Sequence, residues 1–319
     1  VGPKVKSELP QEISDCEDAA HKRMEELLKS GELSAAVTMH YPFPVGVATV
    51  GRVITPARGT PLLLATTTGT SAAERVPALL KNTVYGIAVA KSLGMVEPTV
   101  GVLNIDGARQ LERQLEELAE RGYPIKFGQT VRAYKGAIMR GNDLLAGSPD
   151  VMVCDTLTGN LLMKIFSAYH TGGSYEALGY GYGPGVGPGW KYIVNIISRA
   201  SGAPVIAGAV AFAAACAAAG LPQIVEREWQ AAKRAGIEEL LAPPAREQEA
   251  GETVQPPPKK PTGAEIGGVD VLEIEDAARE LWRKGIYAET GMGCEGPVVL
   301  VAAEDKEQAA AVLKQGGYI

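Results

Sequence analysis

Short apolar segments alternate with helix-length segments along much of the chain, and this alternation constrains the fold most strongly. The apolar segments that predict strands are 35–39, 61–66, 99–105 and 150–154. The segments between them with helical length and periodicity include 72–92 and 108–121. Strands that alternate with helices in this way are typical of βαβ units and a mainly parallel sheet. The sequence therefore predicts an α/β fold, in which ligands bind at the carboxyl ends of the strands.

The composition excludes several other classes of protein. Of the 319 residues, 46% are hydrophobic and 21% are charged, which excludes a disordered chain, a coiled coil and a collagen. The formal net charge of −6 argues against a surface that binds nucleic acid or an anionic membrane. We therefore expect neither nucleic acid nor a membrane among the partners.

A proline- and charge-rich segment divides the chain and is typical of an exposed linker. The other predicted elements are helices at 13–28, 205–219 and 224–241 before it, and a helix at 274–284, a strand at 298–302 and a helix at 305–314 after it. We predict an α/β domain over 1–241, the linker over 242–263 and a small C-terminal α/β module over 264–319.

The cysteines and the targeting signals favour a cytoplasmic protein. The four cysteines are scattered without a CxxC pair, so neither a zinc site nor a disulfide framework is predicted. The most apolar segment, 203–221, is interrupted by Pro204 and is weaker than the roughly 20 strongly apolar residues that cross a bilayer. The start of the chain has no signal-peptide core and no methionine, which is expected of a truncated or processed N-terminus.

The segment DTLTGN, residues 155–160, is a candidate anion site because it directly follows a predicted strand. A strand that leads through a glycine-containing turn into a helix presents backbone N–H groups at the positive end of the helix dipole. We expect Asp155 to end the strand and Asn160 to open the helix, with Lys164 beyond them. The alternative is that Asp155 or Thr158 simply caps the helix.

Glycine occupies every second position from Gly179 to Gly189. So much glycine allows the backbone to approach a ligand closely or to form a nest for phosphate. A mobile lid or a plain connector would have the same composition. The segment also contains tyrosines, Tyr182 among them, that are candidate hydroxyl donors.

Ser198 and Arg199 place a hydroxyl beside a guanidinium, within the segment NIISR. Such a pair suits a phosphate or a developing oxyanion. The alternative is a helix end with an exposed arginine.

Cys294 differs from the other cysteines in its surroundings. Cys154 lies in a predicted strand and Cys216 in an alanine-rich helix, so both are expected to be buried and unreactive. Cys294 lies in GMGCEGP, where glycines give access to the thiol and supply N–H groups for an oxyanion. The alternative is a glycine-rich turn that happens to contain a cysteine.

Several segments resemble the phosphate acyltransferase family, which makes acyl phosphates from acyl carrier protein thioesters. They include IKFGQTVRAYKGAIMRG and SPDVMVCDTLTGNLLMKIFSA. The segments DTLTGNLLMK and NIISRASG also resemble phosphate acetyltransferases, although Ala200 replaces an expected glycine. The resemblance implies a three-layer αβα fold of the phosphate acyltransferase-like, isopropylmalate dehydrogenase-like type. The phosphate-binding residues that it implies are Asp155, Thr158, Gly159, Asn160, Ser198 and Arg199.

The whole chain resembles the alpha-subunit family of component C of the glycine (sarcosine, betaine) reductase complex, including SYEALGYGYGPGVG and GMGCEGPVVLV. In that family a cysteine near the C-terminus carries an acetyl group as a thioester, and Cys294 matches it. Members of the family have more chain before the equivalent of Val1, which implies that the first βα unit is missing.

The resemblance also implies the reaction and its partners. Selenoprotein A delivers a carboxymethyl group as a selenoether, and reduction yields an acetyl equivalent that the catalytic Cys294 captures. Inorganic phosphate, as substrate, then releases acetyl phosphate. The other implied partner is the component C beta subunit, and no metal or bound cofactor is implied.

Two other functions stay open at this stage. The first is a stand-alone phosphate acyltransferase that uses acyl carrier protein or coenzyme A and needs no cysteine. The second is a noncatalytic scaffold subunit with a degenerate phosphate site, whose activity resides in a partner.

Overall fold

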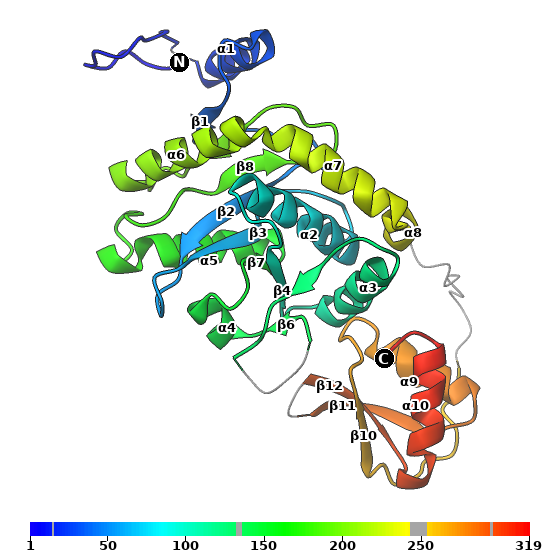
Figure 1. The fold of residues 1–319 in the computed structure, drawn as a ribbon. Coiled ribbons are helices and arrows are strands. Elements are labelled where there is room, and N and C mark those ends of the chain that lie inside the picture. Colours follow the sequence, from blue (N-terminus) through cyan, green and yellow to red (C-terminus); the bar gives the residue numbers. More distant parts are fainter. Residues whose placement is uncertain (15, 132–135, 243–253, 294–295) are drawn as a thin grey trace. The chain divides into compact units, whose positions relative to one another are not determined.

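The computed structural model describes residues 1–14, 16–131, 136–242, 254–293 and 296–319 (Figure 1). The chain divides into two compact units, a larger one of Val1–Leu103 and Leu118–Ile237 and a smaller one of Asn104–Glu117 and Glu238–Ile319. Placing 104–117 with the C-terminal residues was not foreseen, and the domain boundaries drawn from the sequence stay a prediction.

Nine strands of the described chain form one sheet in the larger unit, in the order β1-β9-β8-β2-β3-β7-β4-β5, with β6 beside β4. The strands are β1 (Ala36–Thr38), β2 (Ala48–Ile54), β3 (Pro61–Gly69), β4 (Thr99–Leu103), β5 (Lys126–Phe127), β6 (Ile138–Met139), β7 (Val151–Val153), β8 (Gly183–Val186) and β9 (Val194–Ile196). Five of the described pairs are parallel, and the three pairs that join β3, β2, β8 and β9 are antiparallel. The mainly parallel sheet is therefore confirmed, with an antiparallel section that the sequence did not reveal.

Helices cover both faces of this sheet (Figure 1). They are α1 (Glu17–Ser30), α2 (Arg75–Ser92), α4 (Gly141–Ala146), α5 (Thr156–Ala168), α6 (Ala203–Ala219) and α7 (Leu221–Arg234), while α3 (Ala108–Glu120) is divided between the units and α8 (Ile237–Leu241) lies almost wholly in the smaller one. Successive strand residues face opposite layers. Ala65 and Val151 contact α2 at Gly86, whereas Leu64 and Met152 lie in one cluster with side chains of α5. The three-layer αβα architecture is confirmed.

The single helix predicted over 224–241 is two helices. Helix α7 ends at Arg234, and Gly236 follows with a φ of +85°, before α8 begins. A left-handed residue of this kind ends a helix, and glycine adopts it without steric strain.

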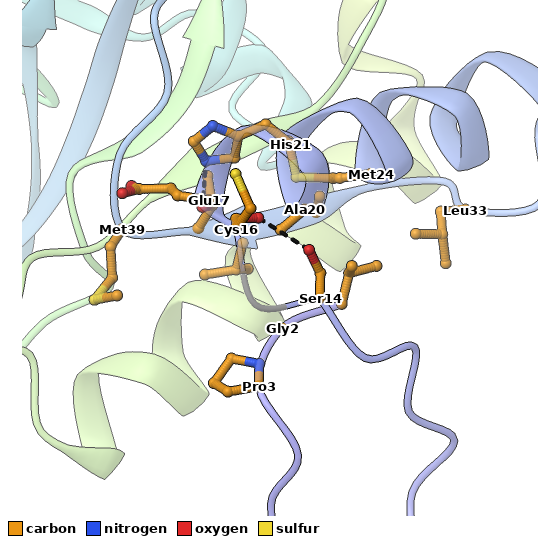
Figure 2. Close-up of a pocket in the computed structure, with 14 residues that line it drawn as sticks. Gly2, Pro3, Ser14, Cys16, Glu17, Ala20, His21, Met24, Leu33 and Met39 are labelled. Carbon is orange, nitrogen blue, oxygen red and sulfur yellow. Dashed lines mark hydrogen bonds between the residues drawn. The ribbon is translucent and has the colours of Figure 1, made fainter.

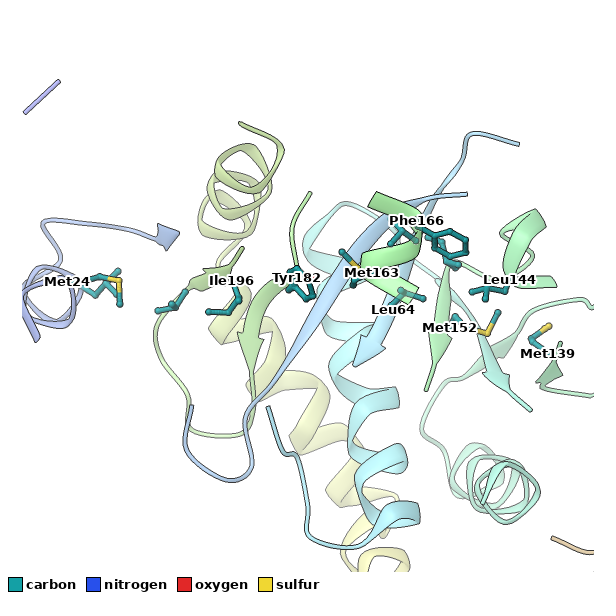
Figure 3. Close-up of a cluster of buried hydrophobic side chains, with 13 residues drawn as sticks. Met24, Leu64, Met139, Leu144, Met152, Met163, Phe166, Tyr182 and Ile196 are labelled. Atoms are coloured by element: carbon teal, nitrogen blue, oxygen red, sulfur yellow. The ribbon is translucent and has the colours of Figure 1, made fainter. Parts of the chain in front are cut away.

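A core cluster of buried side chains fixes α5 on the sheet (Figure 3). Met163 and Phe166 of α5 pack with Leu62 and Leu64 of β3 and Met152 of β7, all at most 5% exposed. Burying a side chain of this size stabilises the fold by about 1.5–3 kcal/mol. The buried apolar side chains of α5 therefore set its position on the sheet. Polar residues of the same helix, such as Asn160, then lie beside the end of β3.

The glycine-rich segment is a buried strand of the sheet. Its core is β8, which pairs antiparallel with β2 and β9. A Cβ at Gly183 would lie 1.8 Å from the carbonyl oxygen of Val50, and one at Gly185 would lie 2.2 Å from the Phe43 ring. These glycines are therefore required by close packing of backbone and ring, which argues against the lid and the connector.

The smaller unit has an antiparallel sheet in the order β10-β12-β11. These strands are β10 (Ala264–Gly267), β11 (Ala288–Gly293) and β12 (Gly296–Val301), and the helices of the module are α9 (Ile274–Arg283) and α10 (Lys306–Gln315). Val299 and Val301 pack against Leu281 of α9 and Leu313 of α10, all fully buried. The prediction of a loop over 291–297 is wrong for its described residues, because 291–293 belong to β11 and pair with 296–298 of β12.

This module also holds the first part of α3. The Asp270 carboxylate accepts hydrogen bonds from the backbone N–H groups of Gly107 (3.1 Å) and Arg109 (3.2 Å), so it caps that helix. The Arg113 guanidinium donates to Glu273 at 2.6 Å and to the Tyr318 carbonyl at 2.9 Å. These contacts explain why 104–117 belong to the smaller unit.

None of the described helices is by itself long and apolar enough to cross a membrane. Helices α6 and α7 reach that length and composition only as a pair, bent by 63°.

Candidate functional site

The first turn of α5 is closed by its own residues. The Asp155 carboxylate accepts a hydrogen bond from the Thr158 backbone N–H at 3.1 Å and from the Thr158 hydroxyl at 2.6 Å. The Arg75 guanidinium lies 3.8 Å from the same carboxylate. Asp155 is therefore the N-cap of α5, and the capping alternative describes what the geometry shows. A role for Asp155 and Thr158 in phosphate binding stays a prediction.

Gly159 allows α5 to approach the backbone of β3. A Cβ at this position would lie 1.8 Å from the Thr66 carbonyl oxygen. Asn160, one residue later, donates its side-chain amide to the Thr67 carbonyl at 3.2 Å. The helix begins at Thr156, so Asn160 lies in its second turn and does not open the helix as predicted.

Threonine hydroxyls join the ends of β2 and β3 beside this turn. The Thr49 hydroxyl lies 2.7 Å from that of Thr67 and 2.9 Å from that of Thr68. Thr67 also donates to the Tyr182 carbonyl at 2.7 Å. A chain of hydrogen bonds thus runs from Asn160 through Thr67 to Tyr182 at this end of the sheet. This chain was not predicted from the sequence.

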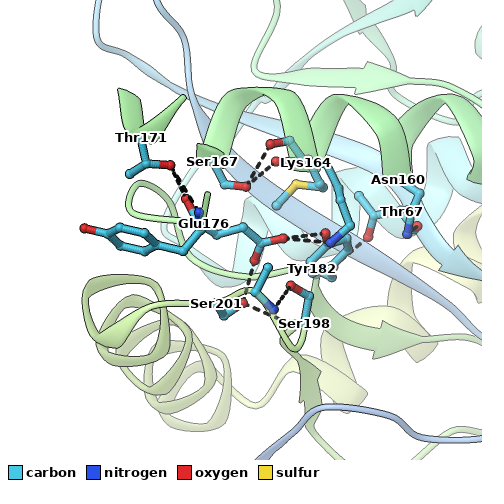
Figure 4. Close-up of polar contacts among 12 residues, drawn as sticks. Thr67, Asn160, Lys164, Ser167, Thr171, Glu176, Tyr182, Ser198 and Ser201 are labelled. Carbon is cyan, nitrogen blue, oxygen red and sulfur yellow. Dashed lines mark hydrogen bonds and ion pairs between the residues drawn. The ribbon is translucent and has the colours of Figure 1, made fainter. Parts of the chain in front are cut away.

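Glu176 is the centre of a polar cluster near the predicted site (Figure 4). Its side chain is 1% exposed and accepts hydrogen bonds from Ser201 (2.5 Å), Tyr182 (2.8 Å) and Lys164 (3.0 Å). We call these four residues, with Ser198, the Glu176 cluster. Burial by itself would raise the pKa of Glu176, but the hydrogen bonds from Ser201, Ser198, Lys164 and Tyr182 lower it below its ordinary value. The carboxylate is therefore ionised at neutral pH.

Lys164 is the cationic member of this cluster. Desolvation would lower the pKa of its ammonium, but the contacts with Tyr182 and Glu176 raise it above its ordinary value. The Lys164 side chain is 49% exposed, while Glu176 is buried. The ammonium is therefore the exposed half of an ion pair whose carboxylate is buried.

Ser198 and Arg199 lie in a tight turn whose backbone is hydrogen-bonded to Glu176. The Ser198 N–H donates to the Ser201 hydroxyl at 3.0 Å, and the Ala200 N–H donates to the Ser198 hydroxyl at 3.1 Å. Backbone bonds join Glu176 to Ala200 and Gly202, each at 2.8 Å. Arg199 is exposed, and no ion pair is found for it within the described part of the chain.

The structure thus brings together some of the predicted residues. Asn160 and Lys164 lie on successive turns of one face of α5, and Lys164 reaches the turn of Ser198 through Glu176. Asp155 and Thr158 lie one turn earlier, bonded to each other. The spacing of four residues between Asn160 and Lys164 was visible in the sequence, whereas nothing in it singled out Glu176 or Ser201.

The predicted burial of Cys154 and Cys216 is confirmed. Cys154 and Cys216 are fully buried, and burial raises the pKa of Cys154 strongly and that of Cys216 to about 11. Cys16 is exposed. Cys294, the predicted catalytic residue, lies outside the described residues. In the described part of the chain no three His, Cys, Asp or Glu side chains gather as metal ligands.

Two cavities of the larger unit lie apart from the Glu176 cluster and share no lining residue with it. The first, of about 570 Å³, lies between the N-terminal segment, α1 and β1, and Cys16, His21 and Met24 line it (Figure 2). The second, of about 340 Å³, is lined by residues that include Lys81, Tyr85 and Trp190.

A protein family described as fatty acid synthesis protein matches residues 1–300. Among curated relatives, the glycine/sarcosine/betaine reductase complex component C subunit alpha of Peptoclostridium acidaminophilum is 53% identical, over 100% of this chain and 84% of its own length. A phosphate acyltransferase of Thermosipho africanus is 37% identical over 27% of this chain and 25% of its own length.

The solved structures give a weaker likeness. A branched-chain phosphotransacylase from Enterococcus faecalis V583 aligns with 62% of this chain and 70% of its own, with 21% identity and a TM-score of 0.38.

Proposed function

The chain belongs to the fatty acid synthesis protein family, and on that premise we propose that it is the acetyl-transferring subunit of a glycine, sarcosine or betaine reductase complex. The observation that carries the proposal is the 53% identity over the full chain to a component C alpha subunit. Similarity to a phosphate acyltransferase supports chemistry on acyl phosphates.

The proposed reaction has two steps at Cys294. In the first step a thiol of a selenoprotein partner reduces the carboxymethyl selenoether that the partner carries, so that the C–Se bond breaks and a selenenylsulfide forms on the partner. The carboxyl group loses its oxygen as water, and the Cys294 thiolate takes the resulting acetyl group as a thioester. An oxygen of inorganic phosphate then attacks the thioester carbonyl, the C–S bond breaks, and acetyl phosphate leaves while the thiolate is regenerated. A covalent carrier divides one difficult transfer into two easier ones. No metal and no further cofactor takes part.

The proposed phosphate site combines residues of α5 with residues of the 198–202 turn, which Glu176 links. Lys164 of α5 is joined through Glu176 and Ser201 to the turn that carries Ser198. Asn160 lies one turn before Lys164 in α5, and Arg199 adds an exposed guanidinium on the turn of Ser198. A guanidinium binds phosphate in a bidentate manner. Asp155 and Thr158 support the site by capping α5, and Gly159 lets the helix approach β3.

The surroundings of the other cysteines make the role of Cys294 testable. The thiolate is the reactive form of cysteine, and burial holds Cys154 and Cys216 in the thiol form at neutral pH. Cys16, which is exposed, is the matched control.

Two partners are part of the proposal, a component C beta subunit and a small selenoprotein. The isolated chain should therefore form little or no acetyl phosphate from glycine. Full glycine-dependent activity of the chain alone would contradict this part.

Exchange of labelled phosphate into acetyl phosphate tests the reaction in the reconstituted complex. Cys294→Ser should abolish exchange, because an oxygen ester is a much poorer acyl donor than a thioester, while Cys16→Ser should leave it unchanged. Undiminished exchange in Cys294→Ser would contradict the thioester.

The likeness to phosphate acyltransferases favours a second candidate, a stand-alone enzyme that uses acyl carrier protein or coenzyme A. It requires no thioester on this chain. Acyl transfer from either donor at a full rate in Cys294→Ser would favour this candidate over the first.

A further inference from the structure

Glu176 lies outside the residues proposed to bind phosphate, yet it is the most completely buried charge near them. Its carboxylate is 1% exposed and accepts hydrogen bonds from three side chains. A buried charge is costly unless it is paired and hydrogen-bonded, and an apolar side chain of the same volume often gives equal stability. Stability alone therefore does not explain a glutamate at this position.

The two oxygens of this carboxylate hold different segments. Oε1 accepts from Lys164, in the third turn of α5, at 3.0 Å and from the Tyr182 hydroxyl at 2.8 Å. Oε2 accepts from the Ser201 hydroxyl at 2.5 Å. The same Ser201 oxygen accepts the Ser198 N–H at 3.0 Å. One side chain thus sets the separation of α5 from the 198–202 turn.

Lys164 has hydrogen-bonding capacity left over. An ammonium has three N–H donors, and its side chain is 49% exposed although Glu176 beneath it is buried. Its Nζ also lies 5.4 Å from the centre of the Tyr182 ring, which limits its movement. A cation fixed in this way is suited to receive an anion from the solvent side.

We infer that Glu176 is a positioning residue that holds Lys164 and the 198–202 turn at the separation at which they bind the phosphoryl group of an acyl phosphate or inorganic phosphate. This inference rests on the proposed function. It adds Lys164 to the phosphate site as a direct ligand and assigns Glu176 a role through Lys164 and Ser201.

The sign of one effect separates positioning from plain electrostatics. A carboxylate near a phosphate repels it, so Coulomb's law alone predicts that removing the charge of Glu176 tightens phosphate binding. Loss of positioning predicts the opposite, because Lys164 and the turn are released.

The test is titration of the full chain with inorganic phosphate, followed calorimetrically. Glu176→Gln should weaken phosphate binding about tenfold or more, since the loss of one charge-assisted hydrogen bond has an effect of that order. Glu226→Gln, the same change at an exposed position of α7, is the matched control and should bind as the wild type does.

A double-mutant cycle excludes a merely structural role. Lys164→Met should also weaken phosphate binding, and in that background Glu176→Gln should have little further effect, because the cation that it positions is gone. Equal effects of Glu176→Gln in both backgrounds would overturn the inference. If Glu176→Gln does not fold, Ser201→Ala replaces it in the test. This variant keeps the carboxylate but loses its hydrogen bond to the turn, and it should also weaken phosphate binding.

The outcomes separate this inference from the proposed function. A wild-type chain that binds no phosphate contradicts the proposed function and the inference with it. A wild-type chain that binds phosphate, with Glu176→Gln binding as well or better, overturns the role of Glu176 alone.

Discussion

Two carboxylates contact helix α5, one at its first turn and one at its third, and their roles differ. In the first turn, Asp155 is 21% exposed and bonds to Thr158 three residues away, so the helix satisfies its own N-terminus. In the third turn, Lys164 meets Glu176, which is 1% exposed and tied to a turn that lies 25 residues further along the chain. The first contact is local and stabilises a helix. The second is long-range and fixes the position of one segment against another.

The contact of α5 with β3 lies between these two ends and should be the most sensitive to change. Gly159→Ala should lower the free energy of unfolding by about 3 kcal/mol or more, because the new Cβ would lie 1.8 Å from the backbone of Thr66. Chemical denaturation measures the loss. Gly141→Ala, where a Cβ meets no atom within 4 Å, should change stability by less than about 1 kcal/mol. Equal losses in the two variants would show that α5 does not need this close approach.

Loss of the Glu176 carboxylate, which contacts Lys164 of α5, should have the next largest effect on stability. Glu176→Gln should lower the free energy of unfolding by about 2 kcal/mol, since hydrogen bonds to a charged group are lost. The effect should depend on pH. The folded-state pKa of Glu176 lies below its ordinary 4.5, so its contribution is present above about pH 4.5 and is lost as the pH falls through the lowered pKa. Acid titration of the denaturation midpoint should therefore show a smaller decline in the variant, and identical acid profiles would contradict the assignment.

The cap should have a smaller effect. Asp155→Ala should cost about 1 kcal/mol, the usual value for loss of an N-cap, while Asp155→Asn, which still caps, should cost less. Thermal unfolding of both variants measures the difference. An equal loss in the two would mean that the charge of Asp155 matters more than its hydrogen bond to Thr158.

Arg199 should have the smallest effect on stability and a clear effect on binding. It is exposed, so Arg199→Ala should change the free energy of unfolding by no more than about 0.5 kcal/mol. Phosphate affinity should fall in Arg199→Ala and also in Arg199→Lys, which keeps the charge but loses the bidentate geometry. Unchanged phosphate affinity in Arg199→Ala would remove this residue from the site.

Local signals were enough to predict much of the fold. The strands β1, β3, β4 and β7 lie within the predicted segments or extend them by a few residues, because uninterrupted apolar runs between turns identify buried strands. Strand β2 contains Gly51 and Arg52, and β8 is half glycine, so propensity argued against both. Their positions follow from close backbone packing that only tertiary structure reveals.

In the candidate site, too, local contacts could be predicted from the sequence and long-range contacts could not. The cap at Asp155 was foreseen as an alternative because an N-cap and its partner lie within one turn of sequence. Glu176 was not, because its partners Lys164 and Ser201 lie 12 and 25 residues away. A polar residue among glycines and tyrosines gives no sign of burial until the sheet is assembled.

The most direct test of the proposed function is the site of acetylation on the chain. The chain is incubated with acetyl phosphate, and its intact mass and peptide map are compared with those of Cys294→Ser and Cys16→Ser. We expect one added acetyl group on Cys294, retained in Cys16→Ser, absent in Cys294→Ser and removed by added phosphate. An acetyl group on Cys16, Cys154 or Cys216, or equal labelling of Cys294→Ser, would contradict it.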